Sequence, residues 1–378
     1  MKILYIIPWL YRGGAEKLVL ETCIQLNKID NVETKIITFK EDNSYLNLSN
    51  KINWIIIHST IKLSIHKKNK YFIKDLEKEI YDFKPDIIHT HLWEAEIISR
   101  CINYKKASWF SHFHDNMLQL QKIKPSFYKK DITDFYERRF TIKKYLEYNN
   151  KFICISKDTL NYAKKVIPKA LQNNIYFLPN AINYNNFYRE KKQNFNSIKL
   201  INIGTFVTKK NQILALEIVK NILHKGSNVE LTFLGDGPEK NKLIEYSIKL
   251  GIQNKIHFAG IVKNVNEYLW NSNIYLHTAI YEPFGLVLIE AMAAGLPVIS
   301  LDGKGNRDFI NHKENGYIFK KQDPEIFADI IIKLFENKKL CQKISKNGQK
   351  TAESYDIKNY VKKLLSLYSD SISSTNSA

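Results

Sequence analysis

The sequence of 378 residues has no long apolar run and only four cysteines. A helix that crosses a bilayer needs about 18 or more apolar residues in succession, so we expect no membrane-spanning segment. The apolar residues 1–8 are too few for a signal peptide, and no small-residue cleavage site follows, so we predict a strand there. The cysteines have no paired spacing, which argues for a reducing compartment and against a zinc site built on cysteine. They are Cys23, Cys101, Cys154 and Cys341.

Two binding patterns are also missing. No Gly-x-Gly-x-x-Gly follows the first predicted strand, which argues against a dehydrogenase that binds a dinucleotide. No two aspartates stand two positions apart, so the sequence has no Asp-x-Asp pair to hold a divalent cation. No repeat of a length typical of solenoid proteins is present.

Acidic residues are few relative to basic ones. The chain has 57 lysines and arginines against 38 aspartates and glutamates, a formal net charge of +19. A surplus of this size attracts anionic lipid headgroups, nucleic acid or phosphorylated substrates, unless it only reflects genome composition. A basic nucleic-acid-binding protein is therefore the non-enzymatic alternative. No signature of a nucleic-acid-binding module is present, so we predict no nucleic-acid partner.

The most basic stretch is Gln121–Lys151, in which lysines and arginines alternate with aromatic residues. We predict a helix over residues 130–148, with Phe135, Arg138 and Arg139 on one face. Such a helix is suited to peripheral contact with an anionic membrane. The alternative is a solvated helix whose aromatic side packs into its own domain.

The most informative stretch is residues 280–300. It lies between two short apolar runs of strand type, residues 274–277 and 297–301. Residues 285–294 have no internal glycine or proline and consist of helix formers, and a Gly-Leu-Pro exit follows. The order strand–loop–helix–strand is typical of a parallel α/β sheet, in which ligands bind beyond the carboxyl ends of the strands.

Two glutamates frame this predicted helix. Glu282 precedes it, and Glu290 lies inside it in otherwise apolar sequence, where a carboxylate needs a partner or a task. A structural ion pair would be the simpler explanation for a lone glutamate. The amides of Phe284, Gly285 and Leu286 would open the helix and offer a site for a phosphate group.

Together these residues resemble a known family. Glu282 and Glu290, with seven residues between them and Pro-Phe-Gly after the first, are similar to the double-glutamate motif of retaining GT-B glycosyltransferases, and within these of glycosyltransferase family 4. The resemblance covers nearly the whole chain. It implies an α/β GT-B fold of two Rossmann-like parallel-sheet domains that face a central cleft. It also implies that Glu290 holds the ribose of a nucleotide-sugar donor and that Glu282 lies against the sugar.

Positions in the first half also match this family. Gly13 and Gly14 resemble its N-terminal glycine loop. His114 stands at the end of a predicted strand and resembles the histidine that lies close to the donor sugar.

In the second half, Lys210 matches a lysine that holds the diphosphate of the donor. The arginine that the family places before this lysine corresponds to Thr205, which is a departure from the pattern. We expect Lys209 or Arg307 to supply the missing positive charge.

Two His-x-His pairs, at residues 89–91 and 112–114, lie close together in the sequence. Alternate residues share one face of a strand, so each pair can in principle bind a metal ion. No cysteine or carboxylate completes a ligand set, and we therefore predict that His89 is a core residue with hydrogen-bonding partners.

The order of predicted strands and helices divides the chain. Residues 1–184 are the predicted N-terminal Rossmann-like domain on the acceptor side, and residues 198–355 the predicted C-terminal domain that binds the donor. Residues 185–197 are polar, without a clear period, and form the predicted linker. By resemblance, a helix over residues 356–370 crosses back to the N-terminal domain, and we expect residues 371–378 to form a disordered tail.

The resemblance implies a retaining hexosyltransferase that moves a sugar from a nucleotide-diphosphate sugar to a saccharide or lipid-linked acceptor. Because no Asp-x-Asp pair is present, the charge that develops on the diphosphate must be met by Lys210, the amides at residues 284–286 and the helix dipole. We therefore expect no cofactor and no metal. By family habit, the product is a bacterial capsule, lipopolysaccharide or exopolysaccharide, made in the cytoplasm or at the inner face of the cell membrane. A nucleotide-sugar 2-epimerase, which has the same two-domain architecture, is the alternative enzyme.

Overall fold

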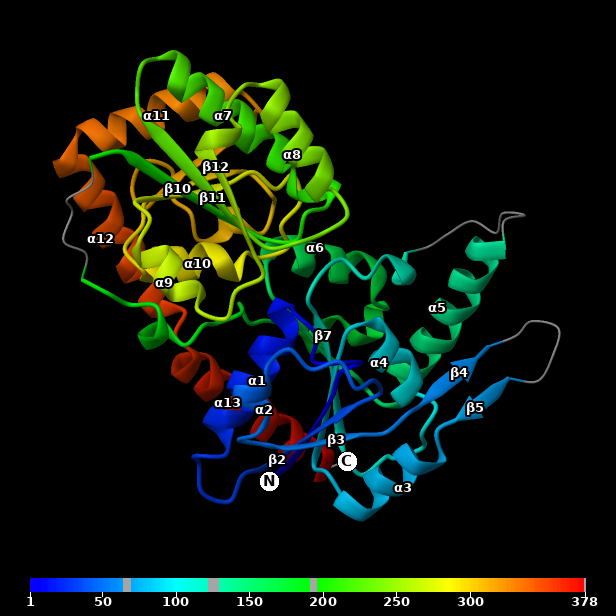
Figure 1. Cartoon of the computed structure of the whole chain (residues 1–378). Helices are drawn as coiled ribbons and strands as arrows, with labels where there is room; N and C mark the ends of the chain where they lie inside the picture. The colour runs from blue at the N-terminus through cyan, green and yellow to red at the C-terminus, as the bar shows by residue number, and fades with distance from the viewer. Residues whose placement is uncertain (64–68, 122–128, 191–195, 377–378) are drawn as a thin grey trace. The chain divides into compact units, whose positions relative to one another are not determined.

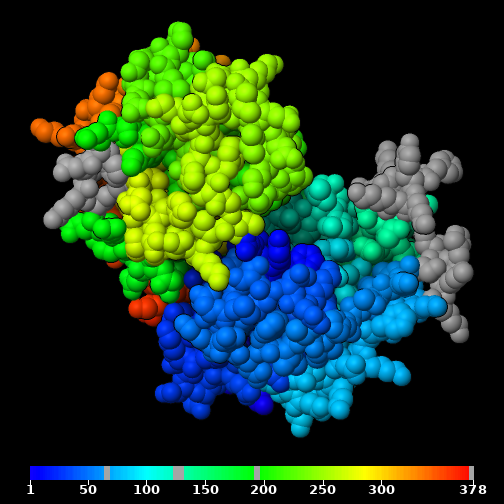
Figure 2. All heavy atoms as spheres, in the orientation of Figure 1, coloured from blue at the N-terminus to red at the C-terminus, as the bar shows by residue number. Residues whose placement is uncertain are grey.

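A computed structural model describes residues 1–63, 69–121, 129–190 and 196–376 of the chain (Figures 1 and 2). The chain divides into two compact units. Unit 1 comprises Met1–Ala181 together with Ile357–Ala378, and unit 2 comprises Ile182–Asp356. Residues 191–195 of the predicted linker lie outside the described residues.

The described part of unit 1 is built around a seven-stranded parallel sheet with the strand order β3-β2-β1-β6-β7-β8-β9. The order reverses between β1 and β6, as in Rossmann-like sheets. The strands are β1 Lys2–Ile6, β2 Glu33–Thr38, β3 Asn53–Ile56, β6 Ile87–His91, β7 Ser108–Phe113, β8 Lys151–Cys154 and β9 Ile175–Phe177, with a separate antiparallel pair of β4 Thr60–Lys62 and β5 Lys70–Phe72. The helices are α1 Gly14–Leu26, α2 Leu46–Ser49, α3 Lys74–Phe83, α4 Trp93–Ser99, η1 Leu118–Leu120, α5 Lys129–Glu147, α6 Lys157–Val166, η2 Lys169–Asn174 and α13 Ile357–Asn376.

Both faces of this sheet are covered, which explains the continuous apolar sequence of β1. Ile3 and Tyr5 join a core cluster with residues of α1 and α13. Leu4 and Ile6 point to the opposite side and join a cluster with residues of α3 and α4. Successive residues of β1 therefore serve two different cores.

The C-terminal helix α13 extends further than predicted. It continues to Asn376, so the expected disordered tail is wrong for residues 371–376, and residues 377–378 lie outside the described residues. Ser371 is buried, and its carbonyl oxygen accepts a hydrogen bond of 3.2 Å from Ser108 Oγ of β7. Ile372 packs against the core cluster that contains α1. These contacts stabilise a helical end whose polar sequence alone does not favour order.

The described part of unit 2 contains a six-stranded parallel sheet with the order β12-β11-β10-β13-β14-β15. The order reverses between β10 and β13. The strands are β10 Ile198–Ile203, β11 Val229–Leu234, β12 Ile256–Gly260, β13 Ile274–His277, β14 Val298–Leu301 and β15 Tyr317–Phe319. The helices are η3 Tyr184–Asn186, η4 Thr208–Lys210, α7 Gln212–His224, α8 Lys240–Lys249, η5 Gln253–Lys255, α9 Val265–Trp270, α10 Leu286–Ala293, η6 Asn306–Asp308, α11 Pro324–Glu336 and α12 Lys338–Ser354.

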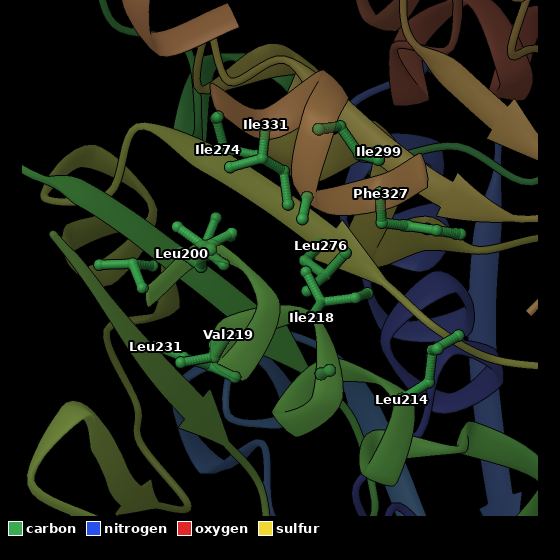
Figure 3. Close-up of a cluster of buried hydrophobic side chains, with 14 of the residues drawn as sticks. Leu200, Leu214, Ile218, Val219, Leu231, Ile274, Leu276, Ile299, Phe327 and Ile331 are labelled. Carbon is green, nitrogen blue, oxygen red and sulfur yellow. The ribbon is translucent and has the colours of Figure 1, made fainter. Parts of the chain in front are cut away.

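The core of unit 2 forms where α7 and α11 pack on one face of the sheet (Figure 3). Side chains of the strands, such as Leu200 and Leu276, meet Ile218 of α7 and Ile331 of α11, and all four are almost fully buried. This packing makes a rigid base for the loops at the carboxyl ends of the strands. No helix in the described ranges is both long and apolar enough to cross a membrane.

Candidate functional site

The loops that follow β10 and β13 lie together, at the point where the strand order of unit 2 reverses. Lys210 ends the short helix η4 after β10, and Glu282 lies in the loop after β13. Thr278 Oγ1 donates a hydrogen bond of 3.0 Å to the carbonyl oxygen of Lys210, and the amide of Ile280 donates one of 2.9 Å to that of Lys209. In open α/β sheets this position is the usual place for a ligand.

Three ionisable side chains meet at Glu282. Lys210 Nζ lies 2.6 Å from Glu282 Oε2, and His277 Nε2 lies 3.2 Å from the same oxygen. The side chains of Lys210 and Glu282 are 19% and 11% exposed, and that of His277 only 2%. Charges that are this little exposed are screened less by water than an ion pair on the surface.

Glu282 is held in its ionised form. Burial acts to raise its pKa, but the charge of Lys210 and the hydrogen bonds from His277 and Lys210 outweigh this and hold the pKa far below its usual range. The pKa of His277 is lowered, because burial disfavours the imidazolium form more than Glu282 favours it. The cluster therefore presents a carboxylate and a neutral imidazole at neutral pH.

The backbone of Glu282 is fixed by the loop after β14. Its amide donates a hydrogen bond of 2.7 Å to the carbonyl oxygen of Gly303, and its carbonyl oxygen accepts one of 3.0 Å from the amide of Gly305. A Cβ atom on Gly305 would overlap the carbonyl oxygen of Pro283. Only glycine allows this close approach of the two loops.

The helix α10 begins directly after Glu282. Gly285 precedes it with φ of +101°, a left-handed conformation that glycine adopts without strain. The amides of Phe284, Gly285 and Leu286 donate no hydrogen bond to any residue in the described ranges. They are available to an anion, which the positive end of the helix dipole also favours.

Glu290 lies inside α10 and is 5% exposed. Both Glu290 and Glu282 lie close enough to Tyr275 of β13 to add to the effect of burial, which raises the pKa of the Tyr275 hydroxyl. The structure therefore brings the two glutamates of the sequence motif into one neighbourhood.

The predicted substitutes for the missing arginine do not contact Glu282 in the described structure. Thr205 is exposed in the loop after β10, and its carbonyl oxygen accepts a hydrogen bond of 3.1 Å from Gln212 Nε2. Arg307 is paired with Asp302, to which its Nε donates a hydrogen bond of 2.9 Å. Arg307 would have to leave this pair in order to supply the positive charge that Thr205 lacks. Lys209, the other predicted substitute, is exposed.

In unit 1, the predicted glycine loop lies between β1 and α1. Gly13 precedes the helix, Gly14 is its first residue, and a Cβ atom on Gly13 would overlap the carboxylate of Glu16. Glu16 is buried and accepts a hydrogen bond of 3.0 Å from Trp9 Nε1. Burial raises the pKa of Glu16 to about 7, and the hydrogen bonds lower it only in part.

His114 follows the last residue of β7, as predicted, and lies in unit 1. Its Nε2 is 2.8 Å from Nδ1 of His91, the buried last residue of β6. Burial lowers the pKa of His114 to about 3, so the ring is neutral at physiological pH.

The sequence reasoning missed several residues that shape these sites. His277, the last residue of β13, contacts Glu282. Its place at the end of a predicted strand was the only sign in the sequence that it could belong to a site. Gly303 and Gly305 lie in a glycine-rich loop that was visible in the sequence, but its contact with Glu282 was not. Glu16 gave no signal beyond its place after the glycine pair.

Two family models match consecutive parts of the chain. The one described as Glycosyltransferase Family 4 matches residues 12–186, and the one described as Glycosyl transferases group 1 matches residues 185–351. A glycosyltransferase of Methanocaldococcus jannaschii, described as uncharacterized, is 28% identical over 328 residues, which are 75% of this chain and 79% of that protein. The lipopolysaccharide core biosynthesis glycosyltransferase LpsE of Rhizobium meliloti is 28% identical over 152 residues, 40% of this chain and 44% of LpsE.

Solved structures share the fold over almost the whole chain. HepE of Anabaena, in complex with UDP, superposes with a TM-score of 0.79 at 17% identity and covers 98% of this chain and 100% of its own. TarM superposes with a TM-score of 0.77 at 15% identity and covers 97% of this chain and 98% of its own.

Proposed function

Because this chain belongs to the GT-B glycosyltransferases described by the two family models, we propose that it transfers a hexose from a UDP-sugar with retention of anomeric configuration. The acceptor is a saccharide or a lipid-linked saccharide. The donor diphosphate is bound without a metal ion. The observation that carries the proposal is the contact between Lys210 and Glu282, beside the open amides at the start of α10.

This arrangement fits the charges that develop during the reaction. When the bond between the anomeric carbon and the phosphate oxygen breaks, negative charge grows on the diphosphate and positive charge on the sugar. Lys210 and the amides of Phe284, Gly285 and Leu286 would stabilise the diphosphate. Glu282, which is held in its ionised form, would stabilise the positive charge of the sugar. These groups are already oriented by the loops, so little reorganisation is needed as the charges form.

The other predicted residues would bind the donor. Glu290 would accept hydrogen bonds from the ribose hydroxyls, and neutral His114 would contact the sugar. The choice of UDP is supported by HepE, which was solved with UDP and with UDP-glucose. Related proteins include LpsE and a poly(ribitol-phosphate) alpha-N-acetylglucosaminyltransferase of Staphylococcus aureus, which supports a role in the synthesis of a bacterial surface polysaccharide.

A thermal-shift screen with UDP, GDP and ADP, with and without EDTA, tests the donor site. We expect UDP to raise the melting midpoint, to the same extent with EDTA, because a ligand of the folded state stabilises it. The shift should be lost in Glu290→Gln. Turnover of the UDP-sugar, with the anomeric configuration of the product read by NMR, then tests transfer and retention. No shift with any nucleotide, or a product of inverted configuration, would contradict the proposal.

We propose a peripheral contact with anionic membrane through α5. Arg138 of the predicted face donates a hydrogen bond to the carbonyl oxygen of Leu120, so part of that face is used internally, and the neighbouring Phe140 packs into the core of unit 1. Arg139 and Lys143 remain exposed one turn apart. Residues 122–128 of the predicted Gln121–Lys151 stretch lie outside the described residues. Sedimentation with anionic vesicles should weaken in an Arg139→Glu/Lys143→Glu variant, and binding equal to that of wild type would contradict this contact.

A further inference from the structure

The pairing of β6 with β7 brings both His-x-His pairs into one cluster. The register places His91 opposite His112. The rings of His89 and His112 lie 5.2 Å apart and those of His91 and His112 lie 4.9 Å apart, measured between centroids. One ring nitrogen from each of these three histidines lies within 4.8 Å of the others. The two strands together therefore bring three candidate ligands to one place, which neither pair does alone.

Two nitrogens of this cluster lack a hydrogen-bond partner within the described residues. Nε2 of His91 and Nε2 of His112 are buried and have no hydrogen-bond partner in the part of the chain that the structure describes. A buried polar atom without a partner is costly, and native proteins rarely leave one unexplained. Here two such atoms belong to neighbouring rings.

The other ring nitrogens of the three histidines lie close to polar partners, and a metal ion would have to displace His112 Nδ1 from its contact with His89 Nε2. His89 Nδ1 lies 2.6 Å from the hydroxyl of Tyr368 in α13, and His91 Nδ1 lies 2.8 Å from His114 Nε2. His112 Nδ1 lies 3.3 Å from Nε2 of His89, and the side chain of Asn180 lies within hydrogen-bonding reach of the ring of His112. Histidines that bind a metal typically hydrogen-bond through the ring nitrogen that faces away from the metal, and this contact fixes the ring and its tautomer.

We propose that His89, His91 and His112 form a buried site for a divalent first-row transition metal, with zinc as the expected ion. Imidazole nitrogens suit zinc, and three of them can form most of a tetrahedral set. The ion would tie β6 to β7 and, through the bond from His89 to Tyr368, to α13. The site belongs to unit 1, whereas Lys210 and Glu282 belong to unit 2. The ion is proposed to hold these elements together, and this role does not rest on the proposed transfer reaction.

The site has a consequence for His114. A metal on Nε2 of His91 leaves the proton of this ring on Nδ1, which then donates to Nε2 of His114. His114 must in turn carry its own proton on Nδ1. The metal would thus fix the tautomer of the residue that we expect to contact the sugar.

Zinc binding to the tag-free protein tests this site. After treatment with a chelator and dialysis, the full chain is titrated with zinc by calorimetry, and its metal content is measured by mass spectrometry. We expect about one zinc ion per chain, and X-ray absorption with a nitrogen shell at about 2.0–2.1 Å. His112→Gln should lose this stoichiometric binding. His257→Gln, which changes an exposed histidine of β12, should keep it.

Tyr368→Phe is the second variant, because it keeps the three histidines and removes only the hydroxyl next to His89. We expect its zinc affinity to fall by about tenfold to a hundredfold, as for other residues that orient a metal ligand. If His112→Gln does not fold, the zinc affinity of Tyr368→Phe and the X-ray absorption of the wild-type protein test the proposed site. If the wild-type chain binds no zinc, the proposed site is wrong, and the cluster is only a stack of neutral imidazole rings. Zinc binding that is unchanged in folded His112→Gln, or unchanged in Tyr368→Phe, also overturns it.

Discussion

Two adjacent lysines in η4 have very different surroundings. Lys210 contacts the carboxylate of Glu282, whereas Lys209 is exposed and contributes its backbone carbonyl to Ile280. The sequence alone ranked Lys210 above Lys209 only through its match to a family motif. The structure supplies a physical difference between the two, which makes them a matched pair for experiment.

We predict that Lys210→Ala lowers turnover by about a hundredfold or more, because it removes a preorganised charge at the donor diphosphate. Lys209→Ala should stay close to wild type. The measurement is the rate of UDP release at saturating donor and acceptor, with the melting midpoint of each variant as a control for folding. Equal losses in the two variants would show that general positive charge, and not the Lys210 contact, is what matters.

We predict that the free energy of unfolding depends on pH through the titration of Glu16. Its pKa is raised from 4.5 to about 7, mainly by burial, so the folded state binds its proton more tightly than the unfolded state does. The stabilisation by this proton is fully present below about pH 4.5 and is lost as the pH rises through about 7. Relative to Glu16→Gln, wild type should lose about 3 kcal/mol of unfolding free energy across this range.

Denaturant unfolding of wild type and Glu16→Gln at a series of pH values measures this effect. Glutamine keeps an oxygen that can accept the hydrogen bond from Trp9 Nε1, so the comparison isolates the titration of the carboxyl group. Parallel stability curves for the two proteins would mean that Glu16 keeps an ordinary pKa in the folded state.

Among the elements, strands and helices were predictable where apolar runs alternate with clear helix stops, as in β13, α10 and β14. What the sequence did not contain was which strands pair and in which register. The contact of His91 with His112 depends on the register between β6 and β7. The contact of His277 with Glu282 depends on the path of the loop after β13. The end of α13 was missed for a similar reason, because Ser371 is stabilised by Ser108 from a distant strand.

The turn after β11 gives a test of a close approach between elements. A Cβ atom on Gly235 would overlap the carbonyl oxygen of Gly204, the residue that follows β10, and Gly235 has φ of +137°. We predict that Gly235→Ala destabilises the protein by about 1–3 kcal/mol more than Gly226→Ala, because backbone atoms have to move apart. Gly226 is the matched control, since it also has a positive φ but no atom within 4 Å of an added Cβ. Denaturant unfolding measures both variants, and equal losses would contradict the close approach.

Taken as a whole, the chain repeats one plan twice. Each unit has a parallel sheet whose order reverses beside its first strand, and in each some of the predicted site residues follow a strand at that reversal. Gly13 and Gly14 follow β1, and Lys210 follows β10. The sequence predicted this plan because the strand–loop–helix pattern recurs in both halves, and the later match to known GT-B structures confirms the fold. The roles of the individual residues stay predictions.

Hydrogen exchange with two ligands tests how these roles divide between the units. UDP lacks the sugar, so we expect it to protect residues 205–211 and 283–287 of unit 2, where Lys210 and the start of α10 lie. A non-hydrolysable UDP-sugar should protect the same segments and, in addition, residues 112–116 around His114 in unit 1, because only the sugar is expected to contact that residue. His114→Ala should remove the additional protection and leave that of unit 2 unchanged.

If UDP alone protects residues 112–116 as strongly as the UDP-sugar does, the role of His114 at the sugar is wrong. Protection of residues 205–211 and 283–287 would still support the nucleotide site at Lys210.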